Sequence, residues 1–365
     1  MKIQHPVYYG DYLQLPKILN AQATESAKYG SAAHDETLFI IIHQTYELWF
    51  KQILHELDSV REIMQKPFVP STDLSVINAR IERVTTIQQI LIDQIQVMET
   101  MTTLDFMEFR DFLVPASGFQ SLQFRLVEAT LGIKAHHRME VEKQFFTSRL
   151  NSDDRKKLEE TENKISIFEL LEAWLERMPF SHFEDFDFWG EYSEAVDKML
   201  KQDRDIISKN PGLDEKMKSM ELKNLDLTQE TFNTLLDSNR YEEWKGQGKV
   251  RLSQKAMLSA VFIYLYRDYP ALQMPFRILN SLVEVDEKFT TWRYRHAIMV
   301  QRILGTKIGT GGSSGHEYLK STTERNRAFI DFFNLATFLI PKNMTPKLPD
   351  VLKDQLDIVY DSLRS

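Results

Sequence analysis

Two histidines each interrupt the apolar face of a predicted long helix. In HDETLFIIIHQTYELWFKQI, residues 34–53, steps of three and four residues define a face whose only polar member is His43. That face contains Phe39, His43, Tyr46, Phe50, Ile53, Leu57, Val60 and Met64. A second face, over residues 275–304, contains Ile278, Leu282, Val285, Phe289, Trp292, His296, Met299 and Ile303. Each helix therefore places one imidazole within the face that it is expected to bury.

A neutral imidazole among aromatic side chains is a suitable axial ligand for haem iron. The chain contains no cysteine, which excludes a thiolate-bound haem, iron–sulfur clusters, disulfides and a cysteine nucleophile. Neither histidine is part of a Glu-x-x-His or His-x-x-Glu pair, so a di-iron carboxylate site is disfavoured. The alternative that each is an ordinary core histidine with satisfied hydrogen bonds stays open at this point.

A second candidate group is an arginine surrounded by phenylalanines in DFMEFRDFLVPASGFQSLQFR, residues 105–125. Arg110 follows Phe106 by four residues, so the two share a helix face, and Phe109 and Phe112 lie close in sequence. A guanidinium in such surroundings needs an anionic partner. That partner is either an internal Asp or Glu, or the carboxylate of a ligand, which arginine binds through two parallel hydrogen bonds.

Two further segments have less specific patterns. The stretch GTKIGTGGSSG, residues 305–315, has five glycines in eleven residues, which is typical of a tight or flexible loop. It lacks the Gly-Lys-Ser/Thr ending of a Walker A loop. It is either a surface connection or a lid in which Thr310 contacts a ligand. At the N-terminus, Tyr9, Tyr12 and Leu13 fit an amphipathic helix start, and on their pattern alone they are structural.

Composition limits the class of protein. Of 365 residues, 42% are apolar and 11% aromatic, which is enough for a sizeable core. Acidic residues outnumber basic ones by 53 to 45, a net charge of -8, which disfavours nucleic acid or an anionic membrane as the main partner. The N-terminus lacks a hydrophobic signal region and no stretch reaches 18 uninterrupted apolar residues. We therefore expect a cytoplasmic protein without transmembrane helices.

The spacing of apolar residues predicts an all-α fold, because helical periods dominate and only 13 glycines and 12 prolines interrupt them. We expect a single domain over residues 1–365, a large helical bundle with a smaller, charge-rich helical subdomain inserted at roughly 150–250. Helices are predicted over residues 11–21, 34–65, 73–100, 104–113, 117–131, 135–147, 152–162, 166–177, 188–209, 228–237, 252–267, 275–304, 324–339 and 348–362.

Four segments together resemble the signature blocks of the tryptophan 2,3-dioxygenases, in the order found in that family. They are residues 34–53, residues 105–125, WRYRHAIMVQRILGTKIGTGGSSG at 292–315 and FNLATFLIP at 333–341. The resemblance covers nearly the whole chain and is weakest across about 135–250. It implies an all-α homotetramer with one haem b per subunit, which is Fe(II) in the active form. It further implies oxidative cleavage of the indole C2–C3 bond of L-tryptophan by O2, giving N-formyl-L-kynurenine, the first step of the kynurenine pathway.

The resemblance also implies roles for the residues around the iron. His296 matches the proximal iron ligand. His43 matches the distal histidine, which contacts the indole N–H of the substrate and not the iron. Phe39 matches a residue that packs on the indole, and Phe106 a pocket position where some members have tyrosine.

For the amino-acid end of the substrate, the resemblance implies that Arg110 binds the carboxylate and that Thr310 contacts the ammonium group. Tyr9, Tyr12 and Leu13 match an N-terminal segment that completes the pocket of a neighbouring subunit. The substrates implied are thus L-tryptophan and O2, with no nucleic acid or membrane as partner.

Three alternatives compete with this function. One is a b-type electron-transfer protein in which His43 and His296 both bind iron, and another is a haem sensor or carrier without turnover. Arg110 disfavours both, since neither requires a group that binds a carboxylate. The third is a dioxygenase with wider tolerance for indoleamines, against which Arg110 and Thr310 favour the free amino acid.

Overall fold

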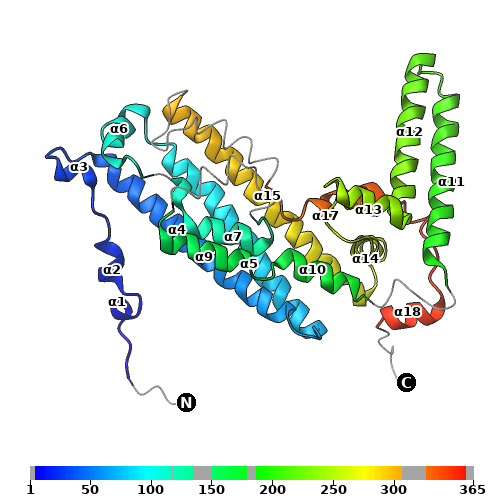
Figure 1. Ribbon diagram of the computed structural model, residues 1–365, viewed down its shortest axis with the longest axis horizontal. Coiled ribbons are helices and arrows are strands. Elements are labelled where there is room, and N and C mark those ends of the chain that lie inside the picture. Colours follow the sequence, from blue (N-terminus) through cyan, green and yellow to red (C-terminus); the bar gives the residue numbers. More distant parts are fainter. Residues whose placement is uncertain (1–4, 117, 135–149, 179–185, 306–325, 359–365) are drawn as a thin grey trace, which may run out of the picture. The chain divides into compact units, whose positions relative to one another are not determined.

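The computed structural model describes residues 5–116, 118–134, 150–178, 186–305 and 326–358 (Figure 1). Within these ranges the regular elements are helices, and an isolated bridge at Phe186 is the closest approach to a strand. The predicted all-α fold is therefore confirmed. In the same ranges, no helix is both long enough and apolar enough to cross a bilayer.

The chain divides into two compact units. Unit 1 contains Met1–Glu56, Val84–Lys164 and Glu287–Arg327, and unit 2 contains Leu57–Arg83, Ile165–Asp286 and Ala328–Ser365. Three long helices contribute residues to both units, namely α4 (His34–Met64), α5 (Ser71–Met98) and α15 (Pro270–Leu304). The inserted subdomain expected at roughly 150–250 stays a prediction.

Unit 1 adds short helices to its parts of α4, α5 and α15. They are α1 (Tyr9–Tyr12), α2 (Leu15–Leu19), α3 (Glu25–Lys28), α6 (Thr103–Met107), η1 (Arg110–Leu113), η2 (Gly118–Gln120), α7 (Leu122–Leu131) and α9 (Ser152–Glu162). The ends of α7 follow from its sequence. The Ser121 side chain accepts a hydrogen bond from the N–H of Phe124, and Gly132 ends the helix with a φ of 120°.

Unit 2 is also helical. It contains α10 (Ile167–Glu176), α11 (Phe188–Lys209), α12 (Glu215–Leu236), α13 (Ser238–Gly246), α14 (Gln254–Leu265), α17 (Ile330–Asn334), η5 (Leu335–Phe338) and α18 (Asp350–Leu356). Figure 1 shows α11 and α12 side by side as a hairpin, and the two helices contact each other along their length. In the turn between them, the N–H of Gly212 donates to the side chain of Asn210 at 2.9 Å.

Several predicted helix boundaries were wrong. The helix expected over 11–21 is divided at Gln14, which has a φ of 53°, and the one expected over 104–113 is divided into α6 and η1. The helix expected at 228–237 begins at Glu215, because its first half is too charged to show an apolar face. α13 was missed because it is short and polar, and α15 begins five residues early, at Pro270. The helix expected at 135–147 lies outside the described residues.

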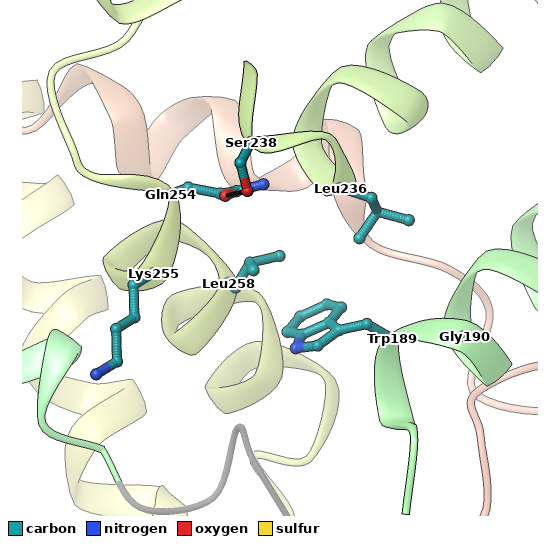
Figure 2. Close-up of a pocket in the computed structure, with 7 residues that line it drawn as sticks. All are labelled: Trp189, Gly190, Leu236, Ser238, Gln254, Lys255 and Leu258. Atoms are coloured by element: carbon teal, nitrogen blue, oxygen red, sulfur yellow. Dashed lines mark hydrogen bonds between the residues drawn. The ribbon is translucent and has the colours of Figure 1, made fainter. Parts of the chain in front are cut away.

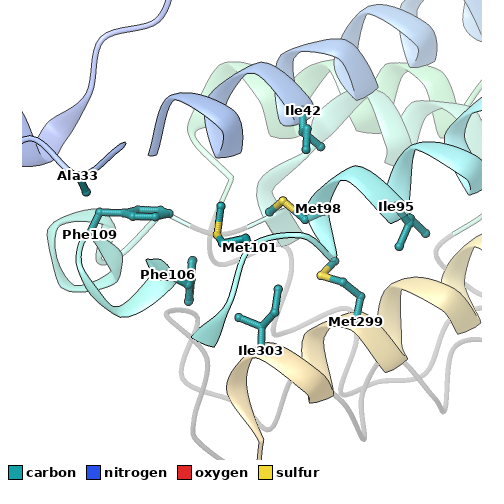
Figure 3. Close-up of a cluster of buried hydrophobic side chains, with 9 residues drawn as sticks. All are labelled: Ala33, Ile42, Ile95, Met98, Met101, Phe106, Phe109, Met299 and Ile303. Atoms are coloured by element: carbon teal, nitrogen blue, oxygen red, sulfur yellow. The ribbon is translucent and has the colours of Figure 1, made fainter. Parts of the chain in front are cut away.

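The two faces that carry the histidines are buried as the spacing predicted. On α4, Ile53 and Leu57 are 0% exposed, while Phe39, His43 and Tyr46 are half-buried. Beside them, the apolar cluster in Figure 3 combines side chains from α4, α5, α6 and α15. Its buried members are Ala33, Ile42, Ile95, Met98, Met101, Phe106, Phe109, Met299 and Ile303.

A buried carboxylate fixes the chain that leads into α4. Glu36, 1% exposed, accepts hydrogen bonds from the backbone N–H groups of Glu25 and Ser26 at 2.7 and 3.0 Å, and from the hydroxyl of Ser26. The same hydroxyl oxygen accepts the N–H of Ala33 at 2.9 Å. These bonds hold residues 25–33 against the start of the helix that carries His43.

We expect Glu36→Ala to lower the free energy of unfolding by about 2–3 kcal/mol, because it leaves several buried donors without an acceptor. Urea denaturation measures the change, and Glu159→Ala, on the exposed face of α9, is the matched control. The control should change stability by less than about 0.5 kcal/mol. Equal effects of the two substitutions would contradict this account of the buried carboxylate.

Candidate functional site

His43 is held on α4 by a bond to its own helix. Its Nδ1 lies 2.7 Å from the carbonyl oxygen of Phe39, so Nδ1 donates and the neutral ring has its free lone pair on Nε2. Burial lowers the pKa of His43, and the bond to Phe39 only partly opposes this effect. The imidazole is therefore neutral near pH 7 and presents an acceptor nitrogen.

His296, on α15, is also kept neutral. Burial, with a smaller contribution from the nearby His43, lowers its pKa to about 4. Its ring is stacked on Trp292 of the preceding turn, with ring centroids 5.4 Å apart and planes inclined by 9°. The structure thus brings the two histidines, which are 253 positions apart in sequence, close enough for His43 to lower the pKa of His296.

Phenylalanines enclose this region. Phe39 lies on His43, with ring centroids 4.2 Å apart, and its centroid is 5.7 Å from that of Phe106 and 5.5 Å from that of Phe109. The position of Phe106 follows from the capping box of α6, in which Thr102 and Asp105 each accept a hydrogen bond from the backbone N–H of the other. The histidine of α4 therefore lies against an aromatic wall.

Arg110 follows this wall directly, in η1. Its side chain is 18% exposed, and its Nη1 lies 3.9 Å from a carboxylate oxygen of Asp111, whose side chain is 83% exposed. That distance is too long for a hydrogen bond, and such an exposed pair contributes little. The contact between Arg110 and Asp111 is therefore weak.

The remaining predicted site residues are placed differently. Tyr9 and Tyr12, on α1, are 70% and 75% exposed, and Leu13 is half-buried. Both tyrosine rings therefore face solvent in the single chain. Thr310 lies outside the described residues, as does most of the glycine-rich segment at 305–315.

Sequence reasoning missed a buried charge cluster next to His296. Glu128 of α7 accepts a bond from Arg293 of α15 at 2.8 Å and one from Arg125 at 2.7 Å. The side chains of Glu128 and Arg293 are 2% and 4% exposed. A charged pair at Arg125 and Glu128 within an otherwise uncharged predicted helix was the signal in the sequence.

The family model described as tryptophan 2,3-dioxygenase matches residues 2–339. The chain belongs to the tryptophan 2,3-dioxygenase family. It is 52% identical to the tryptophan 2,3-dioxygenase of Alteromonas mediterranea, over 96% of this chain and 97% of that protein. It is 51% identical to that of Dictyostelium discoideum, over 99% and 90% of the two chains, and 43% identical to that of Mus musculus, over 94% and 85%.

Membership of the tryptophan 2,3-dioxygenase family confirms the resemblance found in the four sequence segments. The matched range includes the histidines of α4 and α15, the wall of phenylalanines and Arg110. It also spans 135–250, where the sequence resemblance was weakest.

A separate open pocket of about 460 Å³ belongs to unit 2 (Figure 2). It is lined by Trp189, Gly190, Leu236, Ser238, Gln254, Lys255 and Leu258. None of these is a predicted site residue, and the Ser238 hydroxyl already donates to Gln254 at 2.8 Å. This pocket therefore contains none of the residues expected at the site.

The lowered pKa of His296 predicts a loss of stability in acid for the haem-free protein. The ordinary imidazole pKa of 6.5 applies to the unfolded chain, so that state takes up the proton first as the pH falls. This contribution to the free energy of unfolding is complete above pH 6.5 and is lost between about pH 6.5 and 4. A pKa difference of one unit corresponds to about 1.4 kcal/mol. The contribution of His296 to the free energy of unfolding is therefore at most about 3 kcal/mol.

Urea denaturation of wild type and His296→Gln at pH 7 and pH 4 isolates this contribution from the other titrating groups. Because glutamine does not titrate, the variant should lose up to about 3 kcal/mol less than wild type between the two pH values. An identical loss in both proteins would show that His296 is not kept neutral by burial.

Proposed function

We propose that this chain cleaves the indole C2–C3 bond of L-tryptophan with O2 to give N-formyl-L-kynurenine, using haem b. The proposal rests on one observation. Two neutral imidazoles, one from α4 and one from α15, lie near each other, and the phenylalanines that pack on His43 are followed directly by Arg110. Family membership supports the reaction, and the geometry supports the assignment of residues to it.

The residues near His296 suit a haem. The porphyrin supplies four iron ligands, so one neutral imidazole is sufficient to hold the group, and burial keeps His296 in that form. Apolar side chains one and two turns further along α15, Met299 and Ile303, suit the porphyrin face. His296 would therefore be the proximal ligand, and the bound Fe(II) haem would activate O2 for insertion into the indole ring.

His43 would bind substrate and not iron. Its Nδ1 proton is used in the bond to Phe39, so Nε2 is available to accept a hydrogen bond from the indole N–H. This bond orients the indole ring, while Phe39 and Phe106 pack against it and exclude water.

Arg110 would bind the carboxylate of the substrate. The resemblance implies this role, the Arg110 side chain is largely buried, and a guanidinium can form two parallel hydrogen bonds to a carboxylate. Thr310 would contact the ammonium group, as the resemblance implies. Together, a carboxylate-binding and an ammonium-binding group favour the free amino acid over other indoleamines.

The assembly is also part of the proposal. Tyr9 and Tyr12 are exposed in the single chain together with the neighbouring Val7 and Tyr8, and a contiguous run of exposed apolar side chains is typical of an interaction site. We propose a homotetramer in which Tyr9, Tyr12 and Leu13 complete the pocket of a neighbouring subunit. A cytoplasmic location, based on the cysteine-free sequence, stays a prediction.

Incubating the reduced, haem-loaded protein with L-tryptophan and isotopically labelled O2 tests the reaction. We expect N-formylkynurenine containing two labelled oxygen atoms. Unchanged tryptophan with haem demonstrably bound would instead favour an electron-transfer or sensor protein.

Arg110→Ala should raise the KM for L-tryptophan about 10- to 100-fold, because a charge-assisted pair of hydrogen bonds is worth roughly 1.5–3 kcal/mol. Steady-state kinetics measure the change. Arg240→Ala is the control, since Arg240 is half exposed and forms an ion pair with Glu230 in unit 2. A KM that barely moved in Arg110→Ala would remove this residue from the substrate site.

His296→Ala should purify without stoichiometric haem, since it lacks the proximal ligand, whereas His43→Ala should retain haem. The ratio of haem absorbance to protein measures both. If the two variants retained equal amounts of haem, the assignment of His296 as the proximal ligand would be overturned.

A further inference from the structure

The buried cluster formed by Arg125, Glu128 and Arg293 joins α7 to α15. One oxygen of Glu128 accepts from Arg293 at 2.8 Å and the other accepts from Arg125 at 2.7 Å, so both carboxylate oxygens are engaged. All three side chains are at most 8% exposed. A buried ion pair of this kind contributes little net stability compared with apolar packing, which suggests a role in specifying geometry.

Arg293 is fixed on more than one side. Its other terminal nitrogen donates to the carbonyl oxygen of Asn326 at 2.8 Å. Its guanidinium carbon lies 5.6 Å from the ring centroid of Phe124 and 5.8 Å from that of Phe289. Because the guanidinium is planar and binds in two directions, these contacts determine where residue 293 of α15 points.

The preceding residue, Trp292, is fixed in a different direction. Its ring centroid lies 5.9 Å from that of Tyr46 and 6.0 Å from that of Phe50, both on α4. The ring centroid of Trp292 also lies 5.2 Å from the ring centroid of Phe124. Successive residues of an α-helix project about 100° apart. Because these two neighbouring side chains are held in different directions, their contacts restrict the rotation of α15 about its axis.

We propose that the Arg293–Glu128 pair is a positioning contact that sets the rotation of α15, and so the direction in which His296 presents its imidazole to iron. This inference rests on the proposed role of His296 as proximal ligand. His296 follows Arg293 by three residues and Trp292 by four, so a rotation at these positions moves the imidazole by the same angle. A site of this kind has to be held within about 10–20° of its working geometry.

The variant Glu128→Gln tests the proposal, because it keeps the shape and one acceptor oxygen but removes the charge that orients both arginines. Asp331→Asn is the matched control. Asp331 is 1% exposed, lies in unit 2, and accepts the backbone N–H groups of Arg251 and Leu252, each at 2.7 Å. Both substitutions change one buried carboxyl group to an amide, but of the two groups only Glu128 is hydrogen-bonded to a side chain of α15.

In the haem-loaded proteins, we expect Glu128→Gln to displace or broaden the iron–histidine stretching band in the resonance Raman spectrum of the ferrous form. Haem dissociation should become about 10-fold faster, as is common when contacts that orient a metal ligand are lost. The value of kcat should fall while KM for L-tryptophan changes less than about 3-fold, because the substrate contacts remain. Asp331→Asn should match wild type in its iron–histidine band, its haem dissociation rate and its steady-state kinetics.

In the haem-free proteins, hydrogen exchange gives a readout that does not depend on the cofactor. We expect faster exchange of the backbone amides of residues 293–304 in Glu128→Gln than in Asp331→Asn. If Glu128→Gln does not fold, Arg293→Lys replaces it, because lysine keeps the charge but cannot bind Glu128 and Asn326 with two fixed donors.

An iron–histidine band and haem dissociation rate in Glu128→Gln equal to those of Asp331→Asn would overturn the proposal and leave the cluster as a contribution to stability alone. Failure of the proposed function looks different. In that case His296→Ala would bind haem as wild type does, whatever the result for Glu128.

Discussion

Burial of two imidazoles keeps them uncharged, and the chemistry proposed for unit 1 depends on that state. Water is excluded from the facing sides of α4 and α15, so the protonated form of each ring is unfavourable and the pKa of His296 falls to about 4. A protonated His296 could not bind iron, and a protonated His43 could not accept a bond from an indole N–H. The apolar residues around both rings are therefore part of the site's chemistry as well as of the core.

A buried neutral imidazole can bind a partner only if its ring nitrogen points toward that partner. Different contacts fix the orientation of each of the two rings. His43 is oriented within its own helix by the bond to Phe39. His296 has the stacked ring of Trp292 beside it and, one turn earlier, the ion pair of Arg293 with α7. The first arrangement is local, whereas the second needs helices that are distant in sequence.

This difference explains what the sequence could predict. The burial of His43 and His296 followed from helical spacing alone, because apolar residues at steps of three and four mark the face that a helix buries. The pairing of Glu128 with Arg293 could not be predicted, since periodicity does not say which helices pack together or which buried charges meet across 165 positions. The division of the first predicted helix at Gln14 depends on a single left-handed residue, and such a break leaves no periodic signal.

The central claim is that His296 alone binds the iron and leaves His43 for the substrate. The electron paramagnetic resonance spectrum of the ferric, haem-loaded protein tests it most directly. The account predicts a high-spin spectrum without substrate, as expected for one histidine ligand. A low-spin spectrum that becomes high-spin only in His43→Ala would show that both histidines bind iron, and would contradict the account.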